Sequence, residues 1–231
     1  EKFLKEGNFE SVLISHFDTF RSFDTQISSK FFNYFNLNKQ LKPRLFEFEL
    51  SNTCNLECIM CGGNWSSAIR KNREKKPALK SPYDSTFVQQ IKPYLKDLKR
   101  CNFLGGEPFL IHIYYEIWEA LIQENPEIEV AITSNGTVLN NRAKKIIRNL
   151  KNCKITLSVD SLEKNTWENI RRNGDFKILS KNIEWLQNNG KLVSFSVCPI
   201  IQNWKEIPQL VKYCIENDLD IFFNIVYGPL S

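Results

Sequence analysis

The chain alternates short apolar segments with longer amphipathic ones, and this alternation constrains its fold more than any other feature. Each apolar segment is rich in Val, Ile, Leu or Phe, as buried parallel strands are, and segments with helical spacing separate them. Strands joined by helices in this way predict an α/β fold with a parallel sheet and right-handed crossovers. The expected strands are residues 45–50, 101–104, 128–133, 154–159, 192–198 and 220–226, and the expected helices are residues 85–98, 111–124, 140–150, 176–188 and 205–217.

The residues before this alternation have a different pattern. Aromatic and aliphatic side chains recur there at multiples of three or four, which predicts one apolar stripe on a helix. We therefore expect an N-terminal helical extension over residues 1–43 and an α/β domain over residues 44–231. The stripe is expected to pack on that domain or on another segment, and a docking helix for a peptide substrate is the alternative. Its members are Phe17, Phe20, Ile27, Phe31 and Phe35.

Composition narrows the class of protein. Hydrophobic residues make up 42% of the 231 positions, which supports one large domain with a buried core. The sequence contains neither an apolar run near the ~20 residues of a membrane span nor a secretory leader, so a cytoplasmic location is expected. Both ends are expected to be trimmed, with any C-terminal extension absent after Ser231.

The net charge of +5 is modest, and its densest basic stretch is residues 70–76. This stretch lacks the interleaved aromatic residues on which bases stack. Charge runs usually lie in water, so a solvated loop is expected there. Neither nucleic acid nor a membrane is an expected partner.

Three cysteines, Cys54, Cys58 and Cys61, lie within eight residues directly after the first expected strand. A cubane iron–sulfur cluster normally takes four thiolates, so this run would leave one iron open to a small molecule. A structural zinc site would need a fourth ligand, for which Cys101 and His112 are the nearest candidates. Disulfides are disfavoured because the chain has seven cysteines and three of them are cramped together.

The cysteine run, followed by Gly105-Gly106-Glu107-Pro108 after the second expected strand, resembles the radical S-adenosylmethionine (SAM) superfamily, and within it the SPASM/twitch-type subgroup. The resemblance covers about residues 44–226 and implies a partial (β/α)6 TIM-like barrel. It also implies that Cys54, Cys58 and Cys61 hold a [4Fe–4S] cluster whose fourth iron binds SAM. Reductive cleavage of SAM would then give a 5′-deoxyadenosyl radical that abstracts hydrogen from a substrate.

The same resemblance implies a set of residues that bind SAM. Gly105, Gly106 and Glu107 are expected at its amino group, because glycine lets the backbone approach a ligand closely. Arg171 is expected at the carboxylate, with a surface salt bridge as the alternative. The remaining expected contacts are Met60 at the adenine, Pro108 at the exit of the glycine turn, Ser134 and Asn135 as polar contacts, and Ser158 and Asp160 at the ribose or methionyl group.

Alternation along a strand predicts that Ser158 and Asp160 both point into the barrel. Asn135-Gly136 is also an ordinary turn dipeptide, so a purely structural role for Asn135 stays open. At the substrate end, Asn203, Trp204 and Tyr227 are candidate lining residues. Cys198 is either a core residue or a cavity-facing thiol that donates a hydrogen atom.

These expectations favour a radical SAM oxidoreductase or maturase that acts on a peptide, as in the maturation of ribosomally made peptides, or on a small metabolite. The electron would come from an external one-electron reductant of the flavodoxin or ferredoxin type. Two alternatives remain: a non-catalytic module that binds the cluster and SAM, and a zinc-stabilised binding domain. Fold alone does not identify the substrate.

Overall fold

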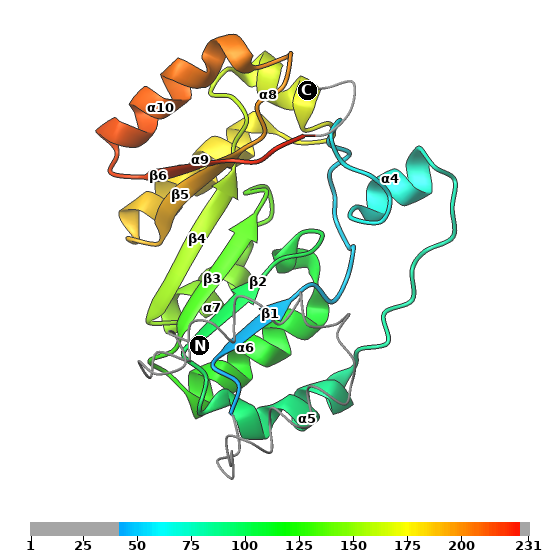
Figure 1. Cartoon of the computed structure of the whole chain (residues 1–231), viewed down its shortest axis with the longest axis vertical. Coiled ribbons are helices and arrows are strands. Elements are labelled where there is room, and N and C mark those ends of the chain that lie inside the picture. The colour runs from blue at the N-terminus through cyan, green and yellow to red at the C-terminus, as the bar shows by residue number, and fades with distance from the viewer. Residues whose placement is uncertain (1–41, 227–231) are drawn as a thin grey trace, which may run out of the picture. The chain divides into compact units, whose positions relative to one another are not determined.

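The computed structural model describes residues 42–226, and within them a six-stranded parallel sheet forms the framework (Figure 1). Each strand pairs with the next one along the chain, so the order in the sheet is β1-β2-β3-β4-β5-β6. This arrangement confirms the predicted α/β fold and partial (β/α)6 barrel. The strands are β1 (Leu45–Phe48), β2 (Arg100–Phe103), β3 (Glu129–Ser134), β4 (Asn152–Ser158), β5 (Leu192–Val197) and β6 (Asp220–Phe223).

Helices connect successive strands, as predicted, and polar side chains cap the amino ends of three of them. Asp84, Asn140 and Asp175 each accept a hydrogen bond from a backbone N–H in the first turn of the helix that follows. Gly190, with φ +61°, lies just after the helix Phe176–Asn188 and helps to end it. The connecting helices are α5 (Ser85–Leu95), α6 (His112–Glu124), α7 (Asn141–Asn149), α9 (Phe176–Asn188) and α10 (Ile207–Glu216).

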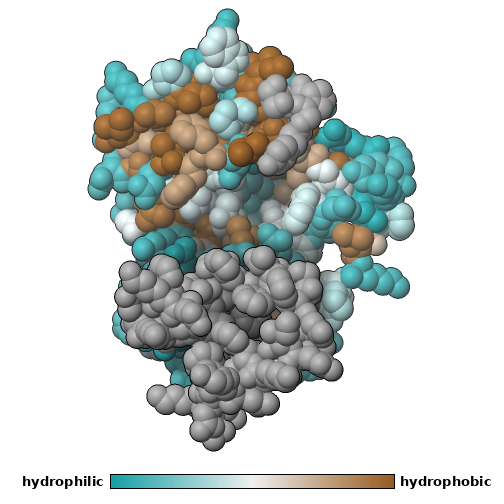
Figure 2. Space-filling view, in the orientation of Figure 1, coloured by the Kyte–Doolittle hydropathy of each residue, from teal (hydrophilic) through white to brown (hydrophobic). Residues whose placement is uncertain are grey.

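Two short helices, α4 (Ser67–Asn72) and α8 (Lys164–Ile170), were not predicted. The expected loop over residues 70–76 is therefore wrong in its first part, which is the end of α4. Ser66 caps this helix by accepting a hydrogen bond from the Ile69 N–H at 3.3 Å, and the Ile69 side chain is buried. Figure 2 shows hydrophilic residues gathered over α4, at the right of the view, so the basic side chains face solvent as expected.

The core lies between the sheet and the helices that cover it. Trp118 of α6 has no exposed surface and packs against Phe103 of β2, with ring centroids 5.3 Å apart. Burial of such large apolar side chains supplies about 1.5–3 kcal/mol each. Tyr114, one turn earlier in α6, directs its hydroxyl to the Phe48 carbonyl at 2.8 Å and accepts a hydrogen bond from the Leu50 N–H at 3.0 Å. The helix thus fixes the point where the chain leaves β1.

Some predictions fall outside the part of the chain that the structure describes. These are the aromatic stripe, nearly all of the expected extension over residues 1–43, and Tyr227. Among the described helices, none is long and apolar enough to cross a bilayer.

Candidate active site

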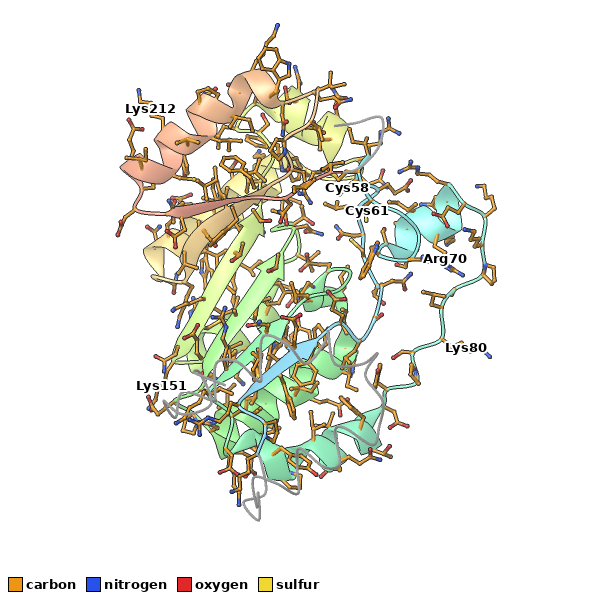
Figure 3. All side chains as sticks on the ribbon, in the orientation of Figure 1. Cys58, Cys61, Arg70, Lys80, Lys151 and Lys212 are labelled. Carbon is orange, nitrogen blue, oxygen red and sulfur yellow. The ribbon has the colours of Figure 1, made fainter. Side chains whose placement is uncertain are left out.

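Residues at or just after the carboxyl ends of β1 to β5 line a cavity of about 290 Å³. This is the edge of a parallel α/β sheet at which functional side chains usually lie. Figure 3 shows Cys58 and Cys61 on the loop between β1 and α4. Of the predicted site residues, those on the cavity wall are Cys54, Cys58, Met60, Cys61, Gly105, Gly106, Ser134, Asn135, Ser158 and Arg171.

The first wall joins the start of the cysteine loop to the glycine turn after β2. Gly106 donates its N–H to the Ser51 carbonyl at 3.0 Å, and Glu107 donates to the Thr53 carbonyl at 2.8 Å. A Cβ on Gly106 would lie 2.7 Å from the carbonyl carbon of Thr53, and Gly105 has φ +104°. Glycine at these positions therefore allows two backbones to approach each other, a role that the sequence analysis had assigned only to the approach of a ligand.

The start of α4 holds the cysteine loop from a second side. The Ser67 hydroxyl lies 3.1 Å from both the N–H and the carbonyl oxygen of Cys54, and the Ser66 hydroxyl donates to the Leu56 carbonyl at 2.7 Å. Because Ser66 also caps α4, formation of this helix and closure of the loop depend on the same side chain.

The end of α8 holds the loop from a third side. Glu57 and Ile59 donate their backbone N–H groups to the carbonyls of Arg172 and Ile170, both at 2.9 Å. These two hydrogen bonds flank Cys58 on one segment and Arg171 on the other. The Arg171 guanidinium Nη1 lies 3.7 Å from the Cys58 sulfur.

Arg171 is also paired with a buried carboxylate. Its Nε donates to Asp160 Oδ2 at 2.7 Å, and Asp160 Oδ1 accepts the Cys198 N–H at 2.8 Å. Burial alone would lower the pKa of Arg171, but the Asp160 charge and the Cys58 sulfur raise that pKa above its ordinary value. The guanidinium is therefore a permanent charge on the cavity wall.

Asp160 itself has no exposed surface and does not line the cavity, which differs from the expectation that it points into the barrel beside Ser158. The reason is that β4 ends at Ser158, so strand alternation no longer controls the direction of residue 160. Asn203, a candidate for the substrate end, is likewise fully buried: its amide donates to the Asp160 and Cys198 carbonyls at 2.8 and 3.0 Å. Trp204 is exposed.

Glu107 also differs from its expected position at the cavity. Its carboxylate is fully buried and accepts hydrogen bonds from the Ser134 hydroxyl at 2.8 Å, the Asn135 N–H at 2.7 Å and the Phe109 N–H at 3.2 Å. Burial raises the pKa of Glu107 to about 7. The side chain thus ties the glycine turn to the end of β3, and Pro108 begins the turn η2 (Pro108–Leu110) beside it.

The cysteine sulfurs lie in a setting that suits an iron–sulfur cluster. Burial raises the pKa of Cys54 to about 11 and also raises the pKa values of Cys58 and Cys61, so a bound cation is needed to keep all three as thiolates at neutral pH. The Asn135 amide nitrogen lies 3.9 Å from the Cys54 sulfur, and Arg171 donates to that of Cys58. N–H donors to ligand sulfurs are a usual feature of iron–sulfur sites.

A single metal ion requires its ligand atoms to lie closer together than a cluster does, because all of them bind the same ion. Tetrahedral zinc brings its sulfur ligands to about 3.8 Å from one another. In the described part of the chain, no three His, Cys, Asp or Glu side chains are grouped in a way that would hold one ion. The three cysteines share a cavity wall, as separate irons of one cluster require.

Several lining residues were missed from the sequence. Glu49, Leu104 and Thr133 lie at or just after strand ends, so their position along the chain was the signal that could have found them. Leu56 and Trp65 belong to the cysteine loop and carry no such signal. Cys198 lines the cavity, so of the two alternatives for this residue the structure favours the cavity-facing thiol over simple core packing.

Comparisons with known proteins agree with this geometry. The family model described as "Radical SAM superfamily" matches residues 48–214. GTP 3′,8-cyclase from Clostridium perfringens is 30% identical over 178 residues, which cover 75% of this chain and 52% of that protein. A probable GTP 3′,8-cyclase from Methanocaldococcus jannaschii is 23% identical over 81% of this chain and 60% of its own length. The chain thus spans only part of these curated relatives.

Solved structures share the fold. SuiB of Streptococcus suis, bound to the precursor peptide SuiA, superposes with a TM-score of 0.65 at 18% identity, covering 87% of this chain and 44% of SuiB. Native anSMEcpe, with bound AdoMet and the Kp18Cys peptide, gives a TM-score of 0.63 at 19% identity over 81% of this chain and 52% of its own. Because the family model spans most of the sequence, the chain belongs to the radical SAM superfamily, whose enzymes use a [4Fe–4S] cluster and SAM.

Proposed function

We propose that the chain is a radical SAM maturase of the SPASM/twitch type that abstracts hydrogen from a peptide. The observation that carries this proposal is the single cavity lined by three cysteines, the glycine turn and Arg171. With SAM bound, the cluster would supply the electron for reductive cleavage of SAM, and this chemistry would start hydrogen abstraction from the peptide. The electron would come from an external donor of the flavodoxin or ferredoxin type.

The chain's own residues would bind and orient the cofactors. Cys54, Cys58 and Cys61 would hold the cluster through their sulfurs. The backbone of Gly105 and Gly106 would offer acceptors to the amino group of SAM, since an ammonium group needs oxygen partners. Around these contacts, Met60 would pack on the adenine, and Ser134, Asn135 and Ser158 would bind polar groups of SAM.

A second hollow supports a peptide as the substrate. It has a volume of about 190 Å³ and shares Glu49, Trp65 and Gly105 with the cysteine cavity. Leu79 and Pro82, from the extended segment before α5, line its far side. A hollow lined by both apolar and polar side chains suits an extended peptide segment. SuiB and anSMEcpe, which share the fold, are named with bound peptides.

GTP is the second candidate substrate, and the curated relatives favour it because both are named as GTP 3′,8-cyclases. A triphosphate needs cationic partners. Among the described residues that line the two hollows, the cationic ones are Lys80 and Arg171, and Arg171 is already paired with Asp160. The scarcity of cationic side chains among these lining residues therefore supports a peptide over GTP.

Formation of 5′-deoxyadenosine tests the reaction. The protein is reconstituted anaerobically with iron and sulfide, reduced with dithionite, and incubated with SAM. We expect product from the parent protein and at least a hundredfold less from Cys58→Ala, because the cluster loses one of its three thiolates. Cys153→Ala is the matched control, since Cys153 is buried in β4 and does not line the cavity.

Product that persists undiminished in Cys58→Ala would overturn the reaction, and a cluster without any product would favour the non-catalytic module. The substrate class is tested by adding a peptide library or GTP to the same assay. We expect peptides to increase 5′-deoxyadenosine formation. An increase with GTP alone would replace the peptide by a nucleotide.

A further inference from the structure

Cys58 and Arg171 face each other because their backbones are paired. The two hydrogen bonds from Glu57 and Ile59 to the carbonyls of Arg172 and Ile170 fix this pairing at both sides of Cys58. Arg171 follows directly after α8, and its N–H still donates to the Trp167 carbonyl at 2.7 Å. The main-chain positions of Cys58 and Arg171 relative to each other are therefore set by backbone hydrogen bonds.

Asp160 fixes the orientation of the guanidinium. One carboxylate oxygen accepts from Arg171 Nε at 2.7 Å, and the other is held by the Cys198 N–H at 2.8 Å. Arg171 is only 9% exposed and Asp160 is fully buried, so water screens this charge pair weakly. With Nε committed to Asp160, Nη1 remains directed at the Cys58 sulfur, 3.7 Å away.

We propose that the Asp160–Arg171 pair sets the reduction potential of the cluster through the Cys58 sulfur. Hydrogen bonds to ligand sulfurs and nearby net charge are two factors by which a protein tunes an iron–sulfur cluster. The Arg171 guanidinium stabilises the reduced, more negative cluster. The Asp160 carboxylate holds the guanidinium in place and partly opposes its charge. Arg171 thus acts as a positioning residue for the cluster, beyond any contact with the SAM carboxylate.

This inference rests on the proposed function, because it requires the cluster. The absence of SAM distinguishes a role of Arg171 toward the cluster from a role toward the SAM carboxylate. An arginine that served only SAM would leave the potential of the cluster unchanged when SAM is absent. An arginine that donates to Cys58 changes the potential without SAM. The measurement is therefore a redox titration of the reconstituted, SAM-free protein, followed by electron paramagnetic resonance of the reduced cluster.

The titration compares Arg171→Gln and Asp160→Asn with the parent. Arg171→Gln is expected to lower the potential and Asp160→Asn to raise it, because they remove charges of opposite sign. At the midpoint of the parent, we expect at least a tenfold change in the ratio of reduced to oxidised cluster, which is about 59 mV for one electron. Arg172→Gln is the matched control: Arg172 is exposed, and its contact with the cysteine loop is through its backbone carbonyl.

Iron and sulfide content per chain shows whether each variant still holds four irons. If Arg171→Gln does not, Arg171→Lys replaces it, because lysine keeps the charge while losing the Nη1 donor, and a smaller decrease is expected. Unchanged potentials in variants with intact clusters would overturn this inference and leave the proposed function standing. Shifts of the same sign in both variants would also overturn it. A parent protein that binds no cluster would overturn both.

Discussion

Two of the three sides that hold the cysteine loop, the glycine turn (the backbone wall) and the end of α8 with Asp160 (the charged wall), differ in the contacts that they add. On the wall of the glycine turn, backbone N–H groups of Gly106 and Glu107 bind backbone carbonyls of the loop. On the side of α8, where two backbone hydrogen bonds also hold the loop, the buried pair of Asp160 and Arg171 contacts the sulfur of Cys58. The first wall depends on space for the backbone and the second on paired charge. Substitutions should therefore disturb the two walls by different mechanisms.

The largest effect is expected on the charged wall. Asp160→Ala would leave the Arg171 guanidinium buried without its partner, which should lower the free energy of unfolding by about 3–5 kcal/mol. Urea unfolding of the parent and the variant measures this loss. The double variant Asp160→Ala/Arg171→Met should recover part of it, because it removes the unpaired charge. A loss below about 1 kcal/mol in the single variant would show that the pair is not needed for stability.

The next largest expected effect is a pH dependence of the free energy of unfolding, caused by Glu107 in the glycine turn. Burial raises the pKa of Glu107 to about 7, whereas an unfolded chain ionises this group near 4.5. As pH rises from about 4.5 to 7, the unfolded state loses its proton first, so stability falls by up to about 3 kcal/mol. Glu107→Gln should flatten this part of the profile, measured by urea unfolding at pH 5 and pH 7.5. An unchanged slope would assign the dependence to other groups.

The smallest expected effect comes from a substitution at Gly106, which tests the close approach of the glycine turn to the backbone of the cysteine loop. In Gly106→Ala, the new Cβ would crowd the backbone at Asn52 and Thr53, which should destabilise the protein by about 1–3 kcal/mol and reduce its iron content. Gly62→Ala is the control within the same loop, since its nearest neighbour would be 3.9 Å away. Equal losses of stability and iron in the two variants would contradict the close approach of the two backbones.

This contrast also explains what the sequence could predict. The strands, their order and the three cysteines follow from local patterns, and so does the glycine turn. The pairing of Cys58 with Arg171 joins residues 113 positions apart, and no local pattern reports it. Helices α4 and α8 have six and seven residues, too short to show a repeating apolar face. The buried positions of Glu107 and Asp160 depend on tertiary contacts that form after their strands end.

The pairing of the cysteine loop with the end of α8 has a consequence for the time at which the site forms during synthesis. The three thiols emerge from the ribosome well before Arg172, whose carbonyl closes the loop around Cys58. At 5–20 residues per second, roughly 6–22 seconds separate the two. Contacts this distant in sequence form late in folding. A newly made chain would therefore display its cysteines before it can enclose a cluster, and productive metal loading would wait until four of the six strands have assembled.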